Sequence, residues 1–359
     1  MSRSKNFHLF TLLVFFTGLY LGIFRVAFPV LEINEYYFVL YSIIIFGFTK
    51  SFMNYVSGYL SDVIGRKKVL ILGWLVSIPL PLIAIIVKSP TLVTLFTVLL
   101  GINQALTWTT TVTSQIDISG KRRAGLASGI NETFGYLGVS IGNFISGLVI
   151  SSFFSPYYLM LLAGLLALGF SNITSETKPN TSLGKGGIVS SLLVGIAGLL
   201  EKFVDAFFWV LVPLYLSVKG PLEISIIVTI YTLTWALLQI PFGYISDLKG
   251  RLLLLVSGFI TMGIGTSIFM LQYYVISAFI SGLGMAMVYP NLIAYVNDYC
   301  SDGNRGRSLG IYRLLRDSGY GFAGLIFLLT YKDLLTAVTL VVLLQLVSIF
   351  PLVYVRGRV

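Results

Sequence analysis

Twelve apolar runs, each long enough for a helix to cross a lipid bilayer, constrain the fold of this chain more than any other feature. We expect helices at 7–30, 36–60, 68–88, 91–116, 122–151, 154–172, 188–218, 222–245, 252–271, 273–298, 306–330 and 334–355. A crossing helix needs about 20 residues, so twelve of them would use about 240 of the 359 residues. With 56% hydrophobic and 11% charged residues, the chain is predicted to be an all-α polytopic membrane protein without a soluble catalytic domain.

The sequence repeats itself halfway along the chain. The segments Gly58 to Arg66 and Gly243 to Arg251 both read Gly-Tyr-x-Ser-Asp-x-x-Gly-Arg, at an offset of 185 residues. Pro29 and Pro213, Asp117 and Asp298, and Gly129 and Gly310 recur at offsets between 181 and 184. A polar stretch at 174–187 predicts a cytoplasmic linker between an N-terminal half at 1–173 and a C-terminal half at 188–359. Two parallel six-helix halves are typical of a large fold of secondary transporters, which bind substrate between the halves.

Positive charges predict the orientation in the membrane. Sixteen Lys and Arg residues fall on one side of the expected spans, and only Lys88, Lys219 and Lys332 fall on the other. Because cytoplasmic loops carry an excess of Lys and Arg, both termini are expected in the cytoplasm, with the chain in the cell membrane. The same rule accounts for the net charge of +10, so the bilayer and not nucleic acid is the expected partner.

Several kinds of chemistry are excluded by residue counts. The chain has one cysteine, Cys300, and one histidine, His8, so we expect no disulfide, no metal site and no cofactor. We find no phosphate-binding loop. The sequence therefore does not predict an enzyme or an ATP-driven pump.

The loop from Gly58 to Lys68 resembles the signature loop of the major facilitator superfamily. This resemblance implies that fold for the whole chain, and it implies a cytoplasmic gate that holds that side closed while the transporter faces outward. In such a gate Asp62 would face the N-terminal end of the helix that begins near Arg305, and Arg66 would contact Asp117. The expected gate residues are Gly58, Asp62, Gly65, Arg66 and Asp117, with Asp247, Gly250, Arg251 and Asp298 as their second-half counterparts. The alternative is that these residues only cap helices and fix topology.

Nine charged residues fall inside the expected spans, where each is costly and is therefore a functional candidate. They are Arg25, Lys50, Glu132, Glu201, Lys202, Asp205, Arg313, Arg316 and Asp317. Lys202 and Asp205 are spaced to pair along one helix, and the resemblance implies a pair between Lys50 and Asp317. Arg25 lies close enough to a helix end to extend towards water.

Glu201 has no evident basic partner in the sequence, and Asp205 follows it on the same face of its helix. Two neighbouring carboxylates repel each other unless one binds a proton. We therefore expect Glu201 to be the site of proton coupling, with Asp205 as its modulator. Glu132 is the next candidate, and its symmetry-equivalent position holds Arg313.

Polar and aromatic residues on the first, fourth, seventh and tenth helices are candidates for the substrate pocket, because these helices line the cavity in the superfamily. They are Tyr20, Asn103, Gln104, Trp108, Trp209, Tyr289 and Asn291. Each of them can equally well serve helix packing or anchor the chain at the membrane interface.

The predicted function is secondary transport of a small solute by alternating access, coupled to protons, by a monomer. We favour efflux of apolar or cationic compounds, with Glu132, Glu201 and Asp205 and an aromatic wall as the binding groups. Glycines 129, 138 and 142 resemble the pattern of drug and proton antiporters, although Asn143 stands in place of its proline. The alternative is an organic anion or metabolite held by Arg25, Lys50, Arg313 or Arg316. A non-transporting membrane sensor is a more distant alternative.

Overall fold

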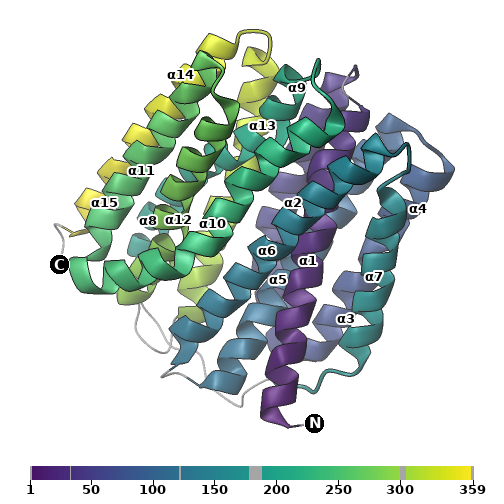
Figure 1. Cartoon of the computed structure of the whole chain (residues 1–359). Helices are drawn as coiled ribbons and strands as arrows, with labels where there is room; N and C mark the ends of the chain where they lie inside the picture. The colour runs from purple at the N-terminus through teal and green to yellow at the C-terminus, as the bar shows by residue number, and fades with distance from the viewer. Residues whose placement is uncertain (1, 33, 121–122, 178–187, 300–304, 357–359) are drawn as a thin grey trace.

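The computed structural model describes residues 2–32, 34–120, 123–177, 188–299 and 305–356, and within these ranges every regular element is helical. Figure 1 shows two groups of long helices side by side, with both termini at one end of the bundle. The expected all-α fold with two six-helix halves is confirmed. Residues 178–187 of the expected linker lie outside the described residues.

The first half contains six spans, of which one is interrupted. Its helices are α1 (Arg3–Leu31), α2 (Tyr36–Ile64), α3 (Arg66–Ser77), α4 (Pro79–Ile86), α5 (Pro90–Ser119), α6 (Ala124–Ser151) and α7 (Tyr157–Asn172). The helix expected at 68–88 is divided between α3 and α4, because Pro79 has no N–H to donate to the preceding turn and instead begins a new helix.

The second half also contains six spans, and two of them are interrupted. Its elements are α8 (Ile188–Ala206), the π-helix η2 (Phe207–Leu211), α9 (Val212–Tyr215), α10 (Pro221–Lys249), α11 (Arg251–Ile268), the 3₁₀ turn η3 (Phe269–Leu271), α12 (Tyr274–Asp298), α13 (Arg305–Thr330), α14 (Leu334–Val347) and α15 (Ile349–Arg356). The span expected at 252–271 ends in η3, and Gln272, whose φ is 63°, separates it from the next span.

Nine helical stretches among the described residues are long and apolar enough to cross a membrane. Three further helices complete the expected twelve. The helix α7 is apolar but has 16 residues, the path from α8 to α9 is interrupted by η2, and α13 carries Arg313, Arg316 and Asp317. Two of these three helices, α8 and α13, contain intramembrane charges, and they pack against each other.

The two halves meet along two pairs of helices, α2 with α13 and α6 with α10. We call the end of the bundle where α1 begins and α2 ends the basic end, and the other the opposite end. Towards the opposite end the halves are tightly packed. A Cβ added at Gly47 of α2 would overlap the backbone of Gly321 in α13, and one added at Gly147 of α6 would overlap Ser225 in α10.

Towards the basic end the same four helices separate. A Cβ added at Gly58 of α2, Gly129 of α6, Gly243 of α10 or Gly310 of α13 would meet nothing within 4 Å. These glycines are the two pairs that recur in the sequence repeat. The halves therefore pack tightly at the opposite end and diverge at the basic end.

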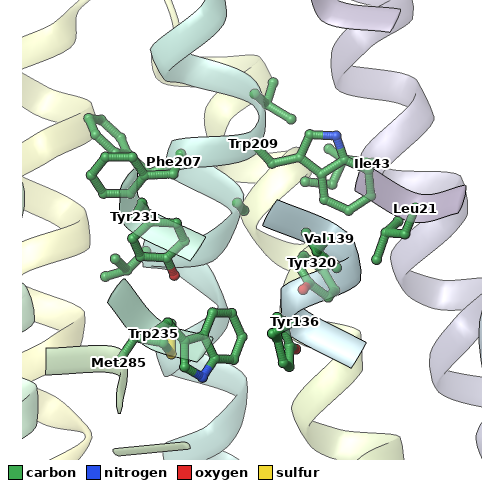
Figure 2. Close-up of a cluster of buried hydrophobic side chains, with 14 of the residues drawn as sticks. Leu21, Ile43, Tyr136, Val139, Phe207, Trp209, Tyr231, Trp235, Met285 and Tyr320 are labelled. Atoms are coloured by element: carbon green, nitrogen blue, oxygen red, sulfur yellow. The ribbon is translucent and has the colours of Figure 1, made fainter. Parts of the chain in front are cut away.

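A buried aromatic cluster closes the centre of the bundle towards the opposite end (Figure 2). Trp209 of η2 packs edge-on against Phe46 and Tyr320, with ring centroids 4.8 and 5.6 Å away. Tyr136 of α6 lies over Trp235 of α10 at 3.6 Å. These rings come from both halves, so they seal the contact between them.

Candidate functional site

A small cavity lies between the halves at the level of the intramembrane charges. Its volume is about 20 Å³, which is room for one or two water molecules. Its walls come from α2, α5, α6, α12 and α13. The lining residues are Lys50, Asn54, Trp108, Glu132, Tyr136, Tyr289, Arg313, Arg316 and Asp317.

Among the described residues three ion pairs cross from one half to the other, and two of them lie at this cavity. Lys50 Nζ of α2 lies 3.5 Å from Asp317 Oδ2 of α13, as the resemblance implied. Glu132 Oε1 of α6 accepts a hydrogen bond of 3.2 Å from Arg313 Nη2 of α13. All four side chains also line the cavity, so a solute that enters it would contact the charges that join the halves.

The third of these pairs lies away from the cavity. Arg25 Nη2 of α1 donates to Asp205 Oδ1 of α8 over 2.6 Å, and both side chains are fully buried. The expectation that Arg25 extends outward to water is wrong, because Asp205 and the ring of Trp209, 5.0 Å from the guanidinium carbon, hold it inside the protein.

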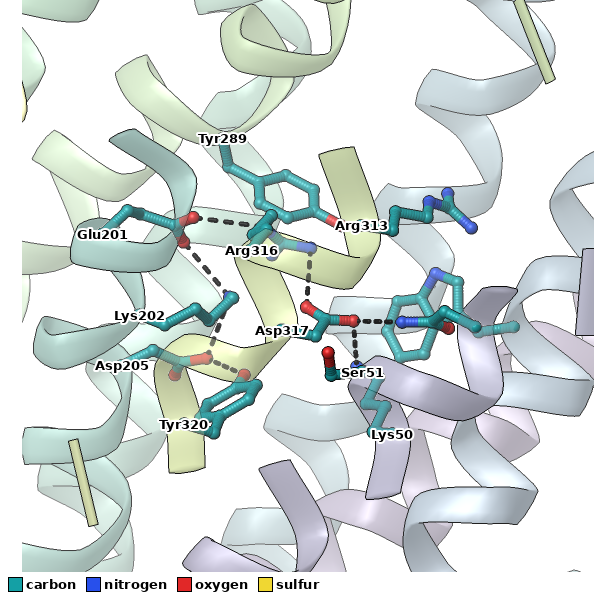
Figure 3. A network of polar contacts seen from close by, with 12 residues as sticks. Lys50, Ser51, Glu201, Lys202, Asp205, Tyr289, Arg313, Arg316, Asp317 and Tyr320 are labelled. Carbon is teal, nitrogen blue, oxygen red and sulfur yellow. Dashed lines mark hydrogen bonds and ion pairs between the residues drawn. The ribbon is translucent and has the colours of Figure 1, made fainter. Parts of the chain in front are cut away.

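The second half contains a continuous chain of charges (Figure 3). Lys202 Nζ lies 3.4 Å from Asp205 Oδ2 and 3.1 Å from Glu201 Oε1, so the expected pair within α8 is present. Arg316 Nε donates to Glu201 Oε2 over 3.1 Å, and its Nη1 donates to Asp317 Oδ1 over 3.3 Å. Glu201 is therefore held by two cations, and the premise that it has no basic partner is wrong.

The predicted pocket residues divide into two groups. Trp108 Nε1 and the Tyr289 hydroxyl both donate to Glu132 Oε2, at 3.0 and 2.5 Å, and both residues line the cavity. The other five are buried away from it. Tyr20, Asn103, Gln104 and Asn291 donate to backbone carbonyls, and Trp209 packs in the aromatic cluster.

Three residues of this region were not predicted. Asn54 donates to Asp317 and lines the cavity, Tyr136 lines it as well, and the Tyr320 hydroxyl donates to Asp205. Two of them, Asn54 and Tyr320, could have been identified from their helical spacing relative to the predicted charges. Asn54 lies one turn after Lys50, and Tyr320 lies three residues after Asp317, so each shares a helix face with a charge that was singled out.

The expected gate residues form two similar clusters at the basic end. Arg66 contacts Asp62 at 2.8 Å and Asp117 at 3.1 Å, and Arg251 contacts Asp247 at 2.7 Å and Asp298 at 2.5 Å. Gly65 and Gly250 precede these arginines with φ of 96° and 91°, a conformation that glycine adopts without strain. The two pairs of Arg66 lie within the first half and the two pairs of Arg251 lie within the second, so none of the four joins the halves.

Asp62 is 58% exposed in its side chain, and its ion pair is with Arg66. The side chains at the beginning of α13, which it was expected to face, lie outside the described residues. Glu176, which follows α7, accepts hydrogen bonds from the backbone N–H groups of Arg66 and Lys67 at 2.9 and 3.2 Å. A carboxylate at the positive end of α3 is favourable, and the residue that provides it is Glu176.

Comparison with known proteins agrees with this architecture. The family model of the Major Facilitator Superfamily matches twice, at residues 10–193 and 194–357. An uncharacterized MFS-type transporter of Methanocaldococcus jannaschii is 27% identical over 281 residues, which are 71% of this chain and 70% of the relative. A crystal structure of a mutant of the nucleoside transporter NupG superposes with a TM-score of 0.71 at 14% identity, covering 97% of this chain and 98% of that one. The chain therefore belongs to the Major Facilitator Superfamily and is a secondary transporter.

Proposed function

We propose that this transporter moves a small polar solute by alternating access, and that protons drive it. The observation that carries the proposal is the pair of ion contacts, Lys50 with Asp317 and Glu132 with Arg313, that both line the cavity and join the halves. A ligand or a proton that changes these contacts changes the balance between two arrangements of the halves.

We place the basic end in the cytoplasm, with the chain acting as a monomer in the cell membrane. The excess of Lys and Arg at that end supports this orientation. Because the halves diverge at the basic end and pack tightly at the opposite end, the structure then corresponds to a conformation that faces the cytoplasm. The gate clusters would join the halves only after the basic end closes.

We assign proton coupling to Glu132 in place of Glu201. Glu201 contacts two cations within its own half, Lys202 beside it and Arg316 on α13. Glu132 instead lines the cavity and contacts Arg313 in the other half. Protonation of Glu132 would remove its negative charge and release Arg313, which weakens a contact between the halves. Binding of a proton would thereby be linked to the conformational change.

The charged lining of the cavity supports a polar solute over the apolar compounds that we favoured from the sequence. Five of its nine residues are ionic, namely Lys50, Glu132, Arg313, Arg316 and Asp317. Three aromatic residues, Trp108, Tyr136 and Tyr289, also line it, but Trp108 and Tyr289 donate hydrogen bonds to Glu132 there. The direction of transport then follows from whether proton and solute move together or in exchange.

Cysteine accessibility tests the proposal without knowledge of the substrate. In a Cys300→Ala background, Gly58→Cys reports on the basic end and Phe28→Cys, which replaces a fully buried residue of α1, reports on the opposite end. We expect maleimide labelling of the two sites to change in opposite directions between pH 8 and pH 5.5 in proteoliposomes.

The matched variants concern two glutamates. Glu132→Gln should make labelling independent of pH, whereas Glu223→Gln, at an exposed glutamate, should leave the pH response unchanged. Labelling that never changes reciprocally would contradict alternating access. A pH response that survives in Glu132→Gln would remove Glu132 from the coupling mechanism.

A further inference from the structure

We propose that the cavity binds a small organic monocarboxylate, with the carboxylate placed between Arg316 and Lys50. This inference rests on the proposed function and names the chemical class of its solute. It follows from a charge imbalance in the buried network, an unused donor on one cavity residue and a loosely held ammonium on another.

The buried network has one more cation than carboxylates. Among the residues that the structure describes, the intramembrane network consists of five cations and four carboxylates, all joined in the ion pairs listed above. A charge that is buried without a counterion is costly, and the cost disappears when an opposite charge binds beside it. One added negative charge balances this network, which is the charge of one carboxylate.

Arg316 has a donor without a hydrogen-bond partner among the described residues. The residue is 4% exposed and lines the cavity. Its Nε and Nη1 are bound to Glu201 and Asp317, while its Nη2 has no hydrogen-bond partner. The ring of Tyr289 lies 4.2 Å from the guanidinium carbon. The guanidinium is thus held in place by three groups and keeps Nη2 available for a charge-assisted hydrogen bond to a carboxylate.

Lys50 provides the second positive group. Its Nζ is 3.5 Å from Asp317 Oδ2, which is the longest of the intramembrane ion pairs. The aromatic rings of Phe46, Trp108 and Tyr320 surround it at 5.7 to 5.9 Å. An ammonium group has three donors, and this one has room for an anion. Lys50 and Arg316 contact different oxygens of Asp317, so an anion bound beside them would share the two cations with that carboxylate.

The remaining lining restricts the rest of the solute. Trp108, Tyr136 and Tyr289 supply aromatic surface beside the two cations, which suits a short apolar or planar body next to the carboxylate. The single excess charge distinguishes a carboxylate from a phosphate ester, because a phosphate monoester carries about 1.5 to 2 negative charges at pH 7. At about 20 Å³ the cavity is smaller than such a carboxylate solute in this conformation, so binding requires its walls to move apart.

Ligand-induced stabilisation of the purified transporter tests this proposal, because a ligand that binds the folded state raises its unfolding temperature. The probes are lactate, pyruvate, benzoate and phenylacetate, each compared with its amide, together with phenyl phosphate and benzylamine. We expect the carboxylates to raise the unfolding temperature of the wild-type protein and the amides to leave it unchanged.

Two variants and one control make the result specific. Lys50→Gln removes the excess charge and leaves four cations with four carboxylates, so it should fold and bind carboxylates at least tenfold more weakly. Arg316→Lys keeps the charge but lacks the forked donors, and it should weaken binding as well. Lys88→Gln, at an exposed lysine near the opposite end, should bind like the wild type.

Carboxylates that stabilise the protein no more than their amides would overturn the inference, as would equal carboxylate binding by Lys50→Gln and the wild type. Stronger stabilisation by phenyl phosphate or benzylamine would overturn it in favour of a phosphate or a cation. In all three cases the reciprocal labelling of Gly58→Cys and Phe28→Cys decides separately whether the proposed transport cycle stands.

Discussion

The ion pair between Arg25 and Asp205 offers the sharpest test of how the halves are held together at the opposite end. Both side chains are fully buried, and their contact of 2.6 Å joins α1 of the first half to α8 of the second. In a conformation that opens at the opposite end, the halves separate there and water replaces the contact. We therefore expect Arg25→Met to destabilise the conformation described here far more than the one that faces the other way.

The size of the effect follows from the surroundings of Asp205. Removing one partner of a buried ion pair typically costs about 3–5 kcal/mol, because it leaves a buried charge without its counterion. Lys202 at 3.4 Å and the Tyr320 hydroxyl still contact Asp205 in the variant, so the lower end of that range, about 3 kcal/mol, applies. Since about 1.4 kcal/mol is a factor of ten, the ratio of the two conformations should change by about two powers of ten.

Distances between spin labels measure this change. Labels at Leu31, at the end of α1, and at Leu329, near the end of α13, are both exposed at the opposite end of the bundle. Arg25→Met should produce a population with a longer distance between them. Lys219→Met is the control, because its ion pair with Glu223 is exposed and lies within one half, where such a pair contributes at most about 1 kcal/mol. Identical distance distributions in Arg25→Met and the wild type would refute the reasoning.

Three further predictions concern the gate, the packing and the orientation. Arg66→Ala should lower the transport rate more than it lowers substrate affinity. Its effect on the rate should also exceed that of Asp62→Asn, because Arg66 contacts two carboxylates while Asp62 is largely exposed. Equal transport rates in the wild type and both variants would mean that the cluster only caps helices. Gly18→Ala should lower the unfolding temperature, because its Cβ would overlap the carbonyl of Gly135. Gly169→Ala meets open space and should be neutral or stabilising by up to about 1 kcal/mol, and equal unfolding temperatures of the two variants would contradict the packing argument. In a Cys300→Ala background, cysteines that replace Lys88, Lys219 or Lys332 should react with impermeant maleimide added outside intact cells. Labelling only after lysis would mean that the orientation in the membrane is the reverse.

Local patterns predicted the spans and the contacts within one half. Apolar length gave the helices, and the repeated Gly-Tyr-x-Ser-Asp motif located the clusters of Arg66 and Arg251 with their carboxylates. The interruption at Pro79 has a local cause that the sequence displays. The π-helix at Phe207–Leu211 also has a local signal, because Pro213 follows it and has no N–H to donate to Trp209, four residues back.

Contacts between the halves were harder to predict, because they depend on how two distant helices face each other. Lys50 with Asp317 was expected only because the superfamily packs these two helices together. Arg25 with Asp205 was missed, since the distance of Arg25 from its helix end favoured an outward orientation. The role of Glu201 was misjudged although its partner Arg316 lies in the same half, because the two residues are 115 positions apart on different helices.

The four glycines that face open space at the basic end have a practical consequence for trapping conformations. Gly58 and Gly310 lie on one pair of facing helices, and Gly129 and Gly243 lie on the other. A Cβ at any of these positions meets no atom within 4 Å, so we expect a tryptophan there to be tolerated while the basic end is open and to act as a wedge when the helices approach each other. Such variants should fold normally and remain locked in a single conformation, which makes them suitable for capturing the open form with antibodies or with ligands that bind from that side.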